Sequence, residues 1–199
     1  MKNNKIYLSV FFIFLFNIIG AVALCFPSLR EVILKLTPLN LLLILGMFLY
    51  ANNDFSLSFL KTILVVFIIG YFIEVLGVRF KFIFGEYYYG ETLGLKILNT
   101  PLIMGVNWLT LSVSTFGIAA YIFKPKILIV IAASVLMVLT DMLIEPISAS
   151  LDFWHWKNSV IPTQNYIAWF LFSLIIHSII LKFDTKPNPF LCFALLGSQ

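Results

Sequence analysis

Charged side chains are scarce in this sequence of 199 residues. Asp, Glu, Lys and Arg make up 11% of it, whereas 61% is hydrophobic and 17% is aromatic. A soluble globular domain carries roughly a quarter charged residues, so this composition excludes an ordinary water-soluble protein and a disordered one. We expect an all-α, polytopic integral membrane protein in which residues 1–199 form a single membrane domain.

The sequence also lacks the motifs of cofactor and metal enzymes. Its two cysteines, Cys25 and Cys192, form no CxxC pair, and neither histidine lies in an HxxxH or HxxE pattern. There is no GxGxxG, no Walker loop and no GxSxG, which leaves nucleotide, flavin and serine-nucleophile chemistry without support. The 13 basic residues form no long run, as is typical of helix-end anchors rather than of a nucleic-acid surface. We therefore expect no metal, no cofactor and no nucleic-acid partner.

What the sequence does have is long apolar runs, most of them about the 20 residues that one membrane crossing needs. They predict a bundle of about six transmembrane helices at residues 6–26, 36–51, 57–78, 97–123, 127–147 and 164–183. The second run is short, which favours a steep tilt or a partly re-entrant segment. The apolar patch at 190–196 is too short to span.

The first run resembles a signal peptide with an Ala-Val-Ala site at 21–23, but it is longer than a usual apolar signal core, so we interpret it as a retained helix. Basic residues divide almost evenly between the two faces of the predicted bundle, so the positive-inside rule does not decide the orientation.

Two connections between the predicted helices are long and rich in aromatic residues. One contains Phe-Gly-Glu-Tyr-Tyr-Tyr-Gly at 84–90, and the other contains Leu-Asp-Phe-Trp-His-Trp at 151–156. Each follows an odd-numbered helix, so six spans place both loops on the same membrane face.

Three carboxylates lie within the predicted spans, where each costs at least about 2.5–3.5 kcal/mol at mid-bilayer. Glu74 is near the end of the third helix, and Asp141 and Glu145 share one face of the fifth at spacing i, i+4. Pro146 ends or kinks that fifth helix. Since the third and fifth helices run parallel, we expect all three carboxylates near the two aromatic loops.

The same face also receives Asp152 and the first residues of the fourth and sixth helices, Asn107-Trp108 and Asn165-Tyr166. We therefore predict a polar pocket with aromatic walls.

Simpler interpretations of these residues stay open at this point. Asp141 and Glu145 could be solvated at the interface, Glu74 could form a salt bridge with Arg79 or Lys81, and the loop aromatics could be an ordinary membrane belt. We interpret His155 as an interface residue and His177 as a packed or hydrogen-bonded core residue.

A cluster of buried carboxyl groups can carry out acid–base chemistry on an apolar substrate. Burial disfavours the anion, so such a group keeps its proton and can act as a general acid. Protonation of an electron-rich C=C bond gives a tertiary cation, which aromatic faces stabilise. Capture of that cation by water gives an alcohol, and capture by a neighbouring double bond gives a ring.

The motifs together resemble the carotenoid biosynthesis membrane protein family, which includes carotenoid 1,2-hydratases that act on bacterioruberin precursors and on γ-carotene or lycopene ends. The resemblance covers about residues 60–183. The stretch 79–82, Arg-Phe-Lys-Phe, is bulky and basic where a small glycine-containing turn is expected. The segments that carry the resemblance are Glu74-Val-Leu-Gly77, residues 84–90, Asn107-Trp108, Asp141-Met-Leu-Ile-Glu145-Pro146, residues 151–156 and residues 165–170.

The resemblance implies a cofactor-independent hydratase of the terminal C1=C2 bond of an acyclic carotenoid. We expect Asp141 or Glu145 to donate the proton, and Glu74 and Asp152 to position or deprotonate water. Substrate-binding residues are expected to be Tyr87, Tyr89, Asn107, Trp108, Trp154, Trp156, Asn165 and Tyr166.

Other activities remain as alternatives to hydration. They are a lycopene-type cyclase, which shares the first proton transfer, a non-enzymatic carotenoid-binding protein, and a proton-coupled transporter. The implied partners are a carotenoid, water, the bilayer of a bacterial inner (cytoplasmic) membrane, and other carotenoid biosynthesis enzymes.

Overall fold

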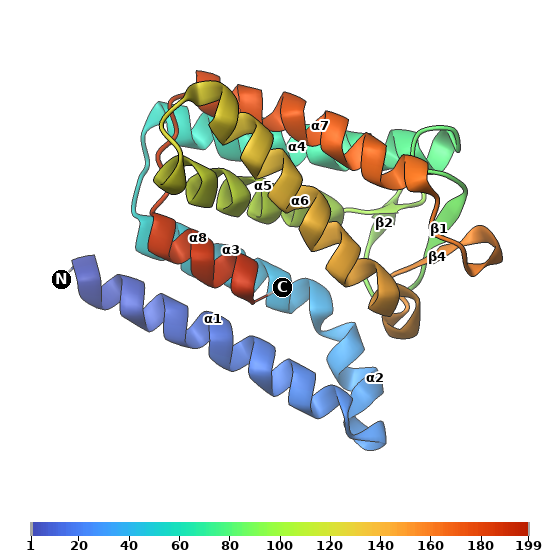
Figure 1. Ribbon diagram of the computed structural model, residues 1–199. Coiled ribbons are helices and arrows are strands. Elements are labelled where there is room, and N and C mark those ends of the chain that lie inside the picture. The colour runs from blue at the N-terminus through green and yellow to red at the C-terminus, as the bar shows by residue number, and fades with distance from the viewer. Residues whose placement is uncertain (1, 199) are drawn as a thin grey trace.

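The computed structural model describes residues 2–198, with side chains from residue 4 onward (Figure 1). Helices dominate it, and the strands are short. In chain order the elements are α1 (Lys2–Leu24), α2 (Pro27–Lys35), α3 (Thr37–Asn52), α4 (Leu57–Arg79), β1 (Tyr87–Tyr89), β2 (Lys96–Ile97), β3 (Thr100–Pro101), α5 (Ile103–Ile122), α6 (Lys126–Ser148), the 3-10 turn Ala149–Leu151, β4 (Trp154–Trp156), the 3-10 turn Lys157–Ser159, α7 (Thr163–Lys182) and α8 (Pro189–Gly197).

Five helices in the described part of the chain, α1, α4, α5, α6 and α7, are long and apolar enough to cross a membrane. The pair α2 and α3, bent by 59°, would make a sixth span. The prediction of an all-α integral membrane bundle of about six spans is confirmed.

Local sequence signals explain several helix ends. The Ser56 hydroxyl caps α4 by accepting the backbone N–H of Phe59. Prolines at the starts of α2, α3 and α8 lack the N–H that a preceding turn would need. The predicted second span, residues 36–51, is α3, and α2 precedes it across a bend at Leu36. The proline at the start of α3 cannot donate the hydrogen bond that would continue α2 through this point.

One predicted boundary at another place was wrong. The fourth span was expected to begin at residue 97, but α5 begins at Ile103. Residues 96–101 instead form the β2–β3 hairpin, because its two turn residues, Leu98 and Asn99, both have positive φ, as a type I′ turn requires. The predicted span 127–147 matches α6 within one residue at each end, and Pro146 lies inside this helix, which continues to Ser148.

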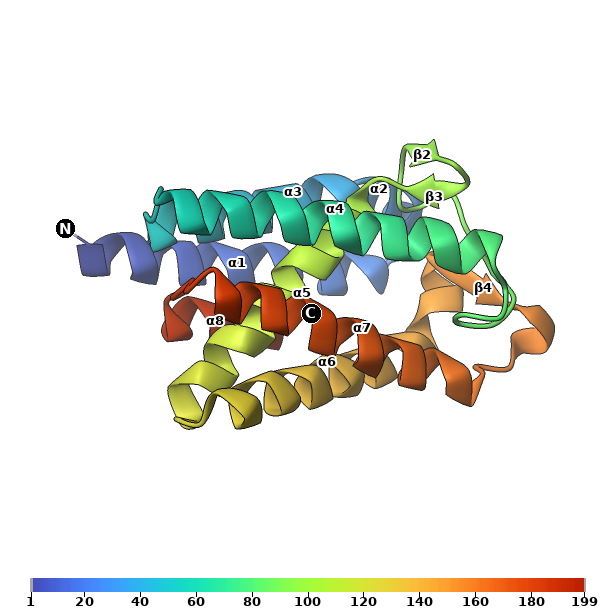
Figure 2. The same cartoon turned by 90° about the horizontal axis from the view of Figure 1, so that it is seen from above.

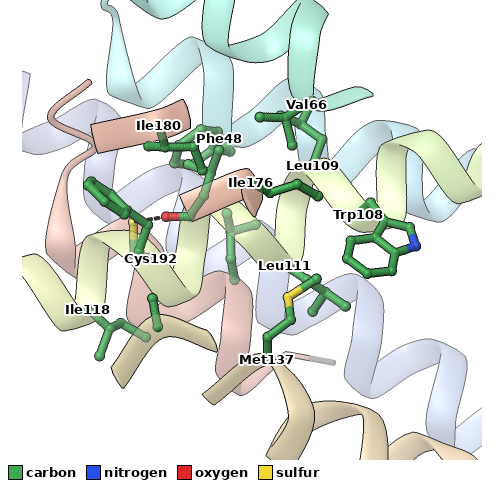
Figure 3. Close-up of a cluster of buried hydrophobic side chains, with 14 of the residues drawn as sticks. Phe48, Val66, Trp108, Leu109, Leu111, Ile118, Met137, Ile176, Ile180 and Cys192 are labelled. Carbon is green, nitrogen blue, oxygen red and sulfur yellow. Dashed lines mark hydrogen bonds between the residues drawn. The ribbon is translucent and has the colours of Figure 1, made fainter. Parts of the chain in front are cut away.

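Helix α5 forms the centre of the bundle and is buried over most of its length. It crosses obliquely between α4 and α6 (Figure 2). Its fully buried side chains Trp108 and Leu111 belong to one core cluster with Met137 of α6 and Ile176 of α7 (Figure 3).

The short helix α8 is too short to span, as predicted, and it packs against α5 inside the bundle. Cys192 of α8 is buried there, with its Sγ 3.6 Å from the carbonyl oxygen of Val113. The apolar patch near the chain end is therefore part of the core (Figure 1).

The two long loops meet at the end of the bundle where α4 and α6 finish and α7 starts (Figures 1 and 2). There β1 and β4 pair antiparallel, with Tyr87 opposite Trp156, Tyr88 opposite His155 and Tyr89 opposite Trp154. This pairing confirms that both loops lie on the same face, and we call it the aromatic cap.

Candidate functional site

Glu74, Asp141 and Glu145 line one cavity under the aromatic cap. Their exposed fractions are 3%, 1% and 4%, so the interpretation of Asp141 and Glu145 as solvated interface residues was wrong. The cavity measures about 20 Å³, which is room for about one water molecule. The predicted convergence of the three carboxylates therefore holds.

Glu74 accepts three hydrogen bonds from aromatic side chains. The hydroxyls of Tyr87 and Tyr89 donate to Oε2 at 2.8 and 2.6 Å, and Nε1 of Trp108 donates to Oε1 at 2.7 Å. Charge-assisted bonds of this kind stabilise an ionised carboxylate. The expected alternative, a salt bridge from Glu74 to Arg79 or Lys81, is not formed, because Lys81 pairs with Glu86 instead.

Glu145 is held in a similar way by the opposite strand. The indole Nε1 atoms of Trp154 and Trp156 donate to Oε2 at 3.0 and 2.7 Å. The amide Nδ2 of Asn165 donates to Oε1 at 3.2 Å. Each strand of the aromatic cap therefore serves one carboxylate, β1 for Glu74 and β4 for Glu145.

Asp141 has fewer hydrogen-bond partners than the other two carboxyl groups. Among the described residues its side chain accepts one hydrogen bond, from Nδ2 of Asn165 at 2.8 Å. The same amide nitrogen bonds Glu145, so Asn165 bridges the two carboxyl groups that lie one helical turn apart on α6.

The alternation of the strands explains which aromatic residues face the cavity. Successive side chains of a strand point to opposite faces, so Tyr87 and Tyr89 of β1 point inward together with Trp154 and Trp156 of β4. Tyr88 points outward and stacks on His155 with ring centroids 5.1 Å apart. The interpretation as an ordinary membrane belt was wrong for the four inward-facing residues.

The environment keeps the two inward tyrosines protonated. Loss of solvent around the hydroxyls, together with the nearby Glu74 carboxylate, raises the pKa of Tyr87 and of Tyr89 well above the usual 10. Both side chains therefore remain hydrogen-bond donors to Glu74 near neutral pH.

Ionic contacts hold the rim of the aromatic cap on its outer side. Glu86 pairs with Lys81 and, at 2.8 Å, with Lys157 of the other loop. Hydrogen bonds and charge from these two lysines lower the pKa of Glu86 to about 2. The two loops are therefore joined by charges as well as by their strands.

Asp152 belongs to this outer network and does not line the cavity. Its side chain is 46% exposed; Oδ1 lies 2.7 Å from Nε2 of His155 and Oδ2 accepts the backbone N–H of Glu91 at 2.8 Å. The hydrogen bond with His155 is the main reason that the pKa of Asp152 is lowered. The structure therefore separates Asp152 from the three carboxylates with which the sequence grouped it.

Three expected substrate-binding residues, Asn107, Trp108 and Tyr166, also do not line the cavity. Asn107 and Tyr166 are half-buried. Trp108 contributes through its bond to Glu74 and by stacking on Trp169, with ring centroids 4.4 Å apart.

The structure adds three lining residues that sequence reasoning missed, Phe84, Met104 and Trp169. The position of Trp169, one turn after Asn165 on α7, is a helical-face signal that would have found it. Phe84 and Met104 are apolar residues among many, and nothing in their sequence context separates them from core positions.

This arrangement suits proton transfer to an apolar molecule. It combines three carboxyl groups, aromatic walls and room for about one water molecule. Among residues 2–198, no group of three or more His, Cys, Asp or Glu side chains is placed to hold a metal ion.

Comparison with known proteins gives one match. No curated protein and no solved structure matches this chain. The family model described as carotenoid biosynthesis protein matches residues 15–190, which include every residue that lines the cavity. The chain therefore belongs to the carotenoid biosynthesis protein family.

Proposed function

We propose that this protein adds water to the terminal C1=C2 double bond of an acyclic carotenoid end group, without a cofactor. Membership of the family points to a lipophilic carotenoid as the substrate. The observation that carries the proposal is a cavity lined by Glu74, Asp141 and Glu145 that has aromatic walls and room for about one water molecule.

In this proposal Asp141 is the proton donor. It accepts a single hydrogen bond, whereas Glu74 and Glu145 each accept three, so its anion is the least stabilised by hydrogen bonds. The Asp141 carboxylic acid transfers its proton to C2 of the substrate. The C=C π electrons form the new C–H bond, and a tertiary cation remains at C1.

The aromatic walls and Glu74 stabilise that cation. Ring faces attract positive charge, and the rings of Tyr87 and Trp156 lie close together, with centroids 5.0 Å apart. In this proposal Glu74 reacts as the anion, which its three donors stabilise, and supplies a negative charge beside the reacting carbon.

Glu145 completes the reaction as the base. The oxygen of a water molecule bonds to C1, and Glu145 removes a proton from the resulting oxonium, which leaves a tertiary alcohol. An oxonium is far more acidic than a carboxylic acid, so a hydrogen-bonded carboxylate is basic enough for this step. The proton then returns from Glu145 to Asp141, which share Asn165 as a partner, so no proton is consumed overall.

Expression in a bacterium that produces lycopene or γ-carotene tests the proposal. We expect a pigment that is heavier by one water molecule and has an unchanged polyene absorption. An isomer of unchanged mass with a shortened chromophore would replace hydration by cyclisation. Pigments identical to those of the empty-vector strain, with the protein present in the membrane, would overturn the proposal.

A further inference from the structure

The small size of the cavity raises the question of how a carotenoid reaches it. This inference rests on the proposed function. Room for about one water molecule does not accommodate the dimethyl-substituted end of an isoprenoid chain. At least one lining side chain must therefore move when the substrate binds.

Most lining side chains are fixed by hydrogen bonds or by the central helix. The cap aromatics and Asn165 each bond a carboxylate. Trp169 is stacked on Trp108, and Met104 lies on the buried helix α5. Phe84 differs from all of these because it is apolar and lies in the irregular segment between α4 and β1.

The Phe84 ring lies where α4 and α7 approach each other. On the α4 side, a Cβ added at Gly77 would collide with Cδ2 of Phe84, so the ring rests on the α4 backbone. On the α7 side, the ring centroid is 6.0 Å from that of Phe172. Phe172 is half-buried and its neighbour Leu171 is exposed on the outer surface of the bundle.

The segment that carries Phe84 is fixed on both sides of it. After it, Gly85 has φ +121°, a conformation that favours glycine, and Glu86 is tied to Lys81 and Lys157. Before it, the amide Nε2 of Gln164 on α7 donates to the carbonyl oxygens of Lys81 and Phe82 at 3.3 and 3.4 Å. Phe84 itself is 1% exposed and is held only by packing, with its ring against those of Tyr87 and Phe172, so the ring can turn aside without the loss of a side-chain hydrogen bond.

We propose that Phe84 closes a lateral portal between α4 and α7, through which the end group of a linear isoprenoid polyene passes from the bilayer to the carboxylates. The exposed rings of Phe80 and Phe82 lie beside the portal and offer the polyene an apolar surface. Phe84 is thereby a residue that controls substrate access and takes no part in the chemistry.

The test measures the association of lycopene with the full chain in nanodiscs. Quenching of tryptophan fluorescence reports arrival at the site, since Trp154, Trp156 and Trp169 line it. We expect Phe84→Ala to raise the association rate constant by about tenfold and Phe84→Trp to lower it, because a step that requires a conformational change limits association. Phe84→Leu serves in place of the alanine variant if that variant does not fold.

Phe48→Ala is the matched control, because it also removes a buried phenylalanine ring but lies on α3, away from the residues that line the cavity. We expect it to leave the association rate unchanged. Equal association rates for wild type and all Phe84 variants would overturn the portal. Association rates that change with the residue at position 84, in a protein that forms no hydrated product, would support the portal and refute the chemistry. An absence of lycopene binding to the wild type would overturn both.

Discussion

The bundle contains two buried polar clusters, and they are built in different ways. Around the first, the carboxyl groups of Glu74, Asp141 and Glu145 receive donors from helices and from the aromatic cap. The second surrounds His177 on α7, whose Nε2 and Nδ1 lie 3.0 Å from the hydroxyls of Thr115 and Ser134. All members of the second cluster lie on helices.

The two clusters differ in charge and in space. His177 is fully buried between two neutral hydroxyl groups and is not among the residues that line the carboxylate cavity. The expectation of a packed, hydrogen-bonded histidine is therefore confirmed. Three ionisable carboxyl groups around a cavity are far more costly to bury, and this cost is the reason that we propose chemistry for the first cluster and packing for the second.

The largest effect that would separate the two clusters is expected for Asp141→Asn. Asparagine keeps the shape of the side chain but cannot transfer the proton. We expect the formation of hydrated carotenoid to fall by about 10²–10⁴-fold, the usual contribution of a general acid. Pigment analysis of membranes with matched protein levels measures this loss. Product formation at the wild-type rate would remove Asp141 from the reaction.

A smaller loss is expected when the donors to Glu145 are removed. Trp156→Phe deletes the indole N–H that lies 2.7 Å from Oε2. A hydrogen bond to a charged group contributes about 1.5–3 kcal/mol, so we expect a loss of roughly 10- to 100-fold in kcat/KM. The matched control is Tyr88→Phe on the opposite strand, whose side chain points outward. An equal loss of kcat/KM in both variants would mean that these substitutions lower activity only by disturbing the fold of the aromatic cap.

In the second cluster a substitution is expected to reduce stability without changing the chemistry. His177→Leu leaves the hydroxyls of Thr115 and Ser134 without their ring partner, at a cost of about 1–3 kcal/mol in the free energy of unfolding. Thermal unfolding in detergent measures this cost. Activity per folded molecule should stay at the wild-type level, and a selective loss of activity would assign His177 a role in the reaction.

The same contrast shows what could be predicted from the sequence. The apolar runs, together with the rule that alternate helices run in the same direction, were enough to predict that Glu74, Asp141 and Glu145 lie together. Membrane spans are set by length and composition. Because each aromatic loop follows an odd-numbered helix, the same rule placed both loops on the correct face. These are properties of individual segments and of their order.

Pairing between distant segments was not predicted from the sequence. The Tyr-Tyr-Tyr and Trp-His-Trp stretches alternate inward and outward only once β1 and β4 have paired, and that register places Asp152 outside the cavity. Aromatic side chains at i and i+2 in both loops were the available signal for two short strands. The packing of α8 in the core likewise depends on contacts far apart in the chain.

The smallest expected effect concerns the ionic rim of the aromatic cap. The pKa of Glu86 falls from the ordinary 4.5 to about 2, chiefly through hydrogen bonds from Lys157 and Lys81. Because the folded-state value is the lower one, these ion pairs stabilise the cap above about pH 4.5, and this contribution is lost as the pH falls toward about 2. The effect is small, since salt and solvent screen surface pairs.

Tryptophan fluorescence measured from about pH 6 to about pH 2.5, a range chosen around the titration of Glu86, would detect the loosening of the cap. Trp154 and Trp156 report it, since they lie beneath this rim. We expect Glu86→Gln to remove part of the pH-dependent change. The matched control is Glu31→Gln, because Glu31 also pairs with a lysine, Lys35, but it lies on α2. If both variants shift the fluorescence transition equally, the change reports general acid unfolding. A shift in Glu86→Gln alone locates the acid-sensitive step at the cap, at the end of the bundle that holds the carboxylates and away from His177.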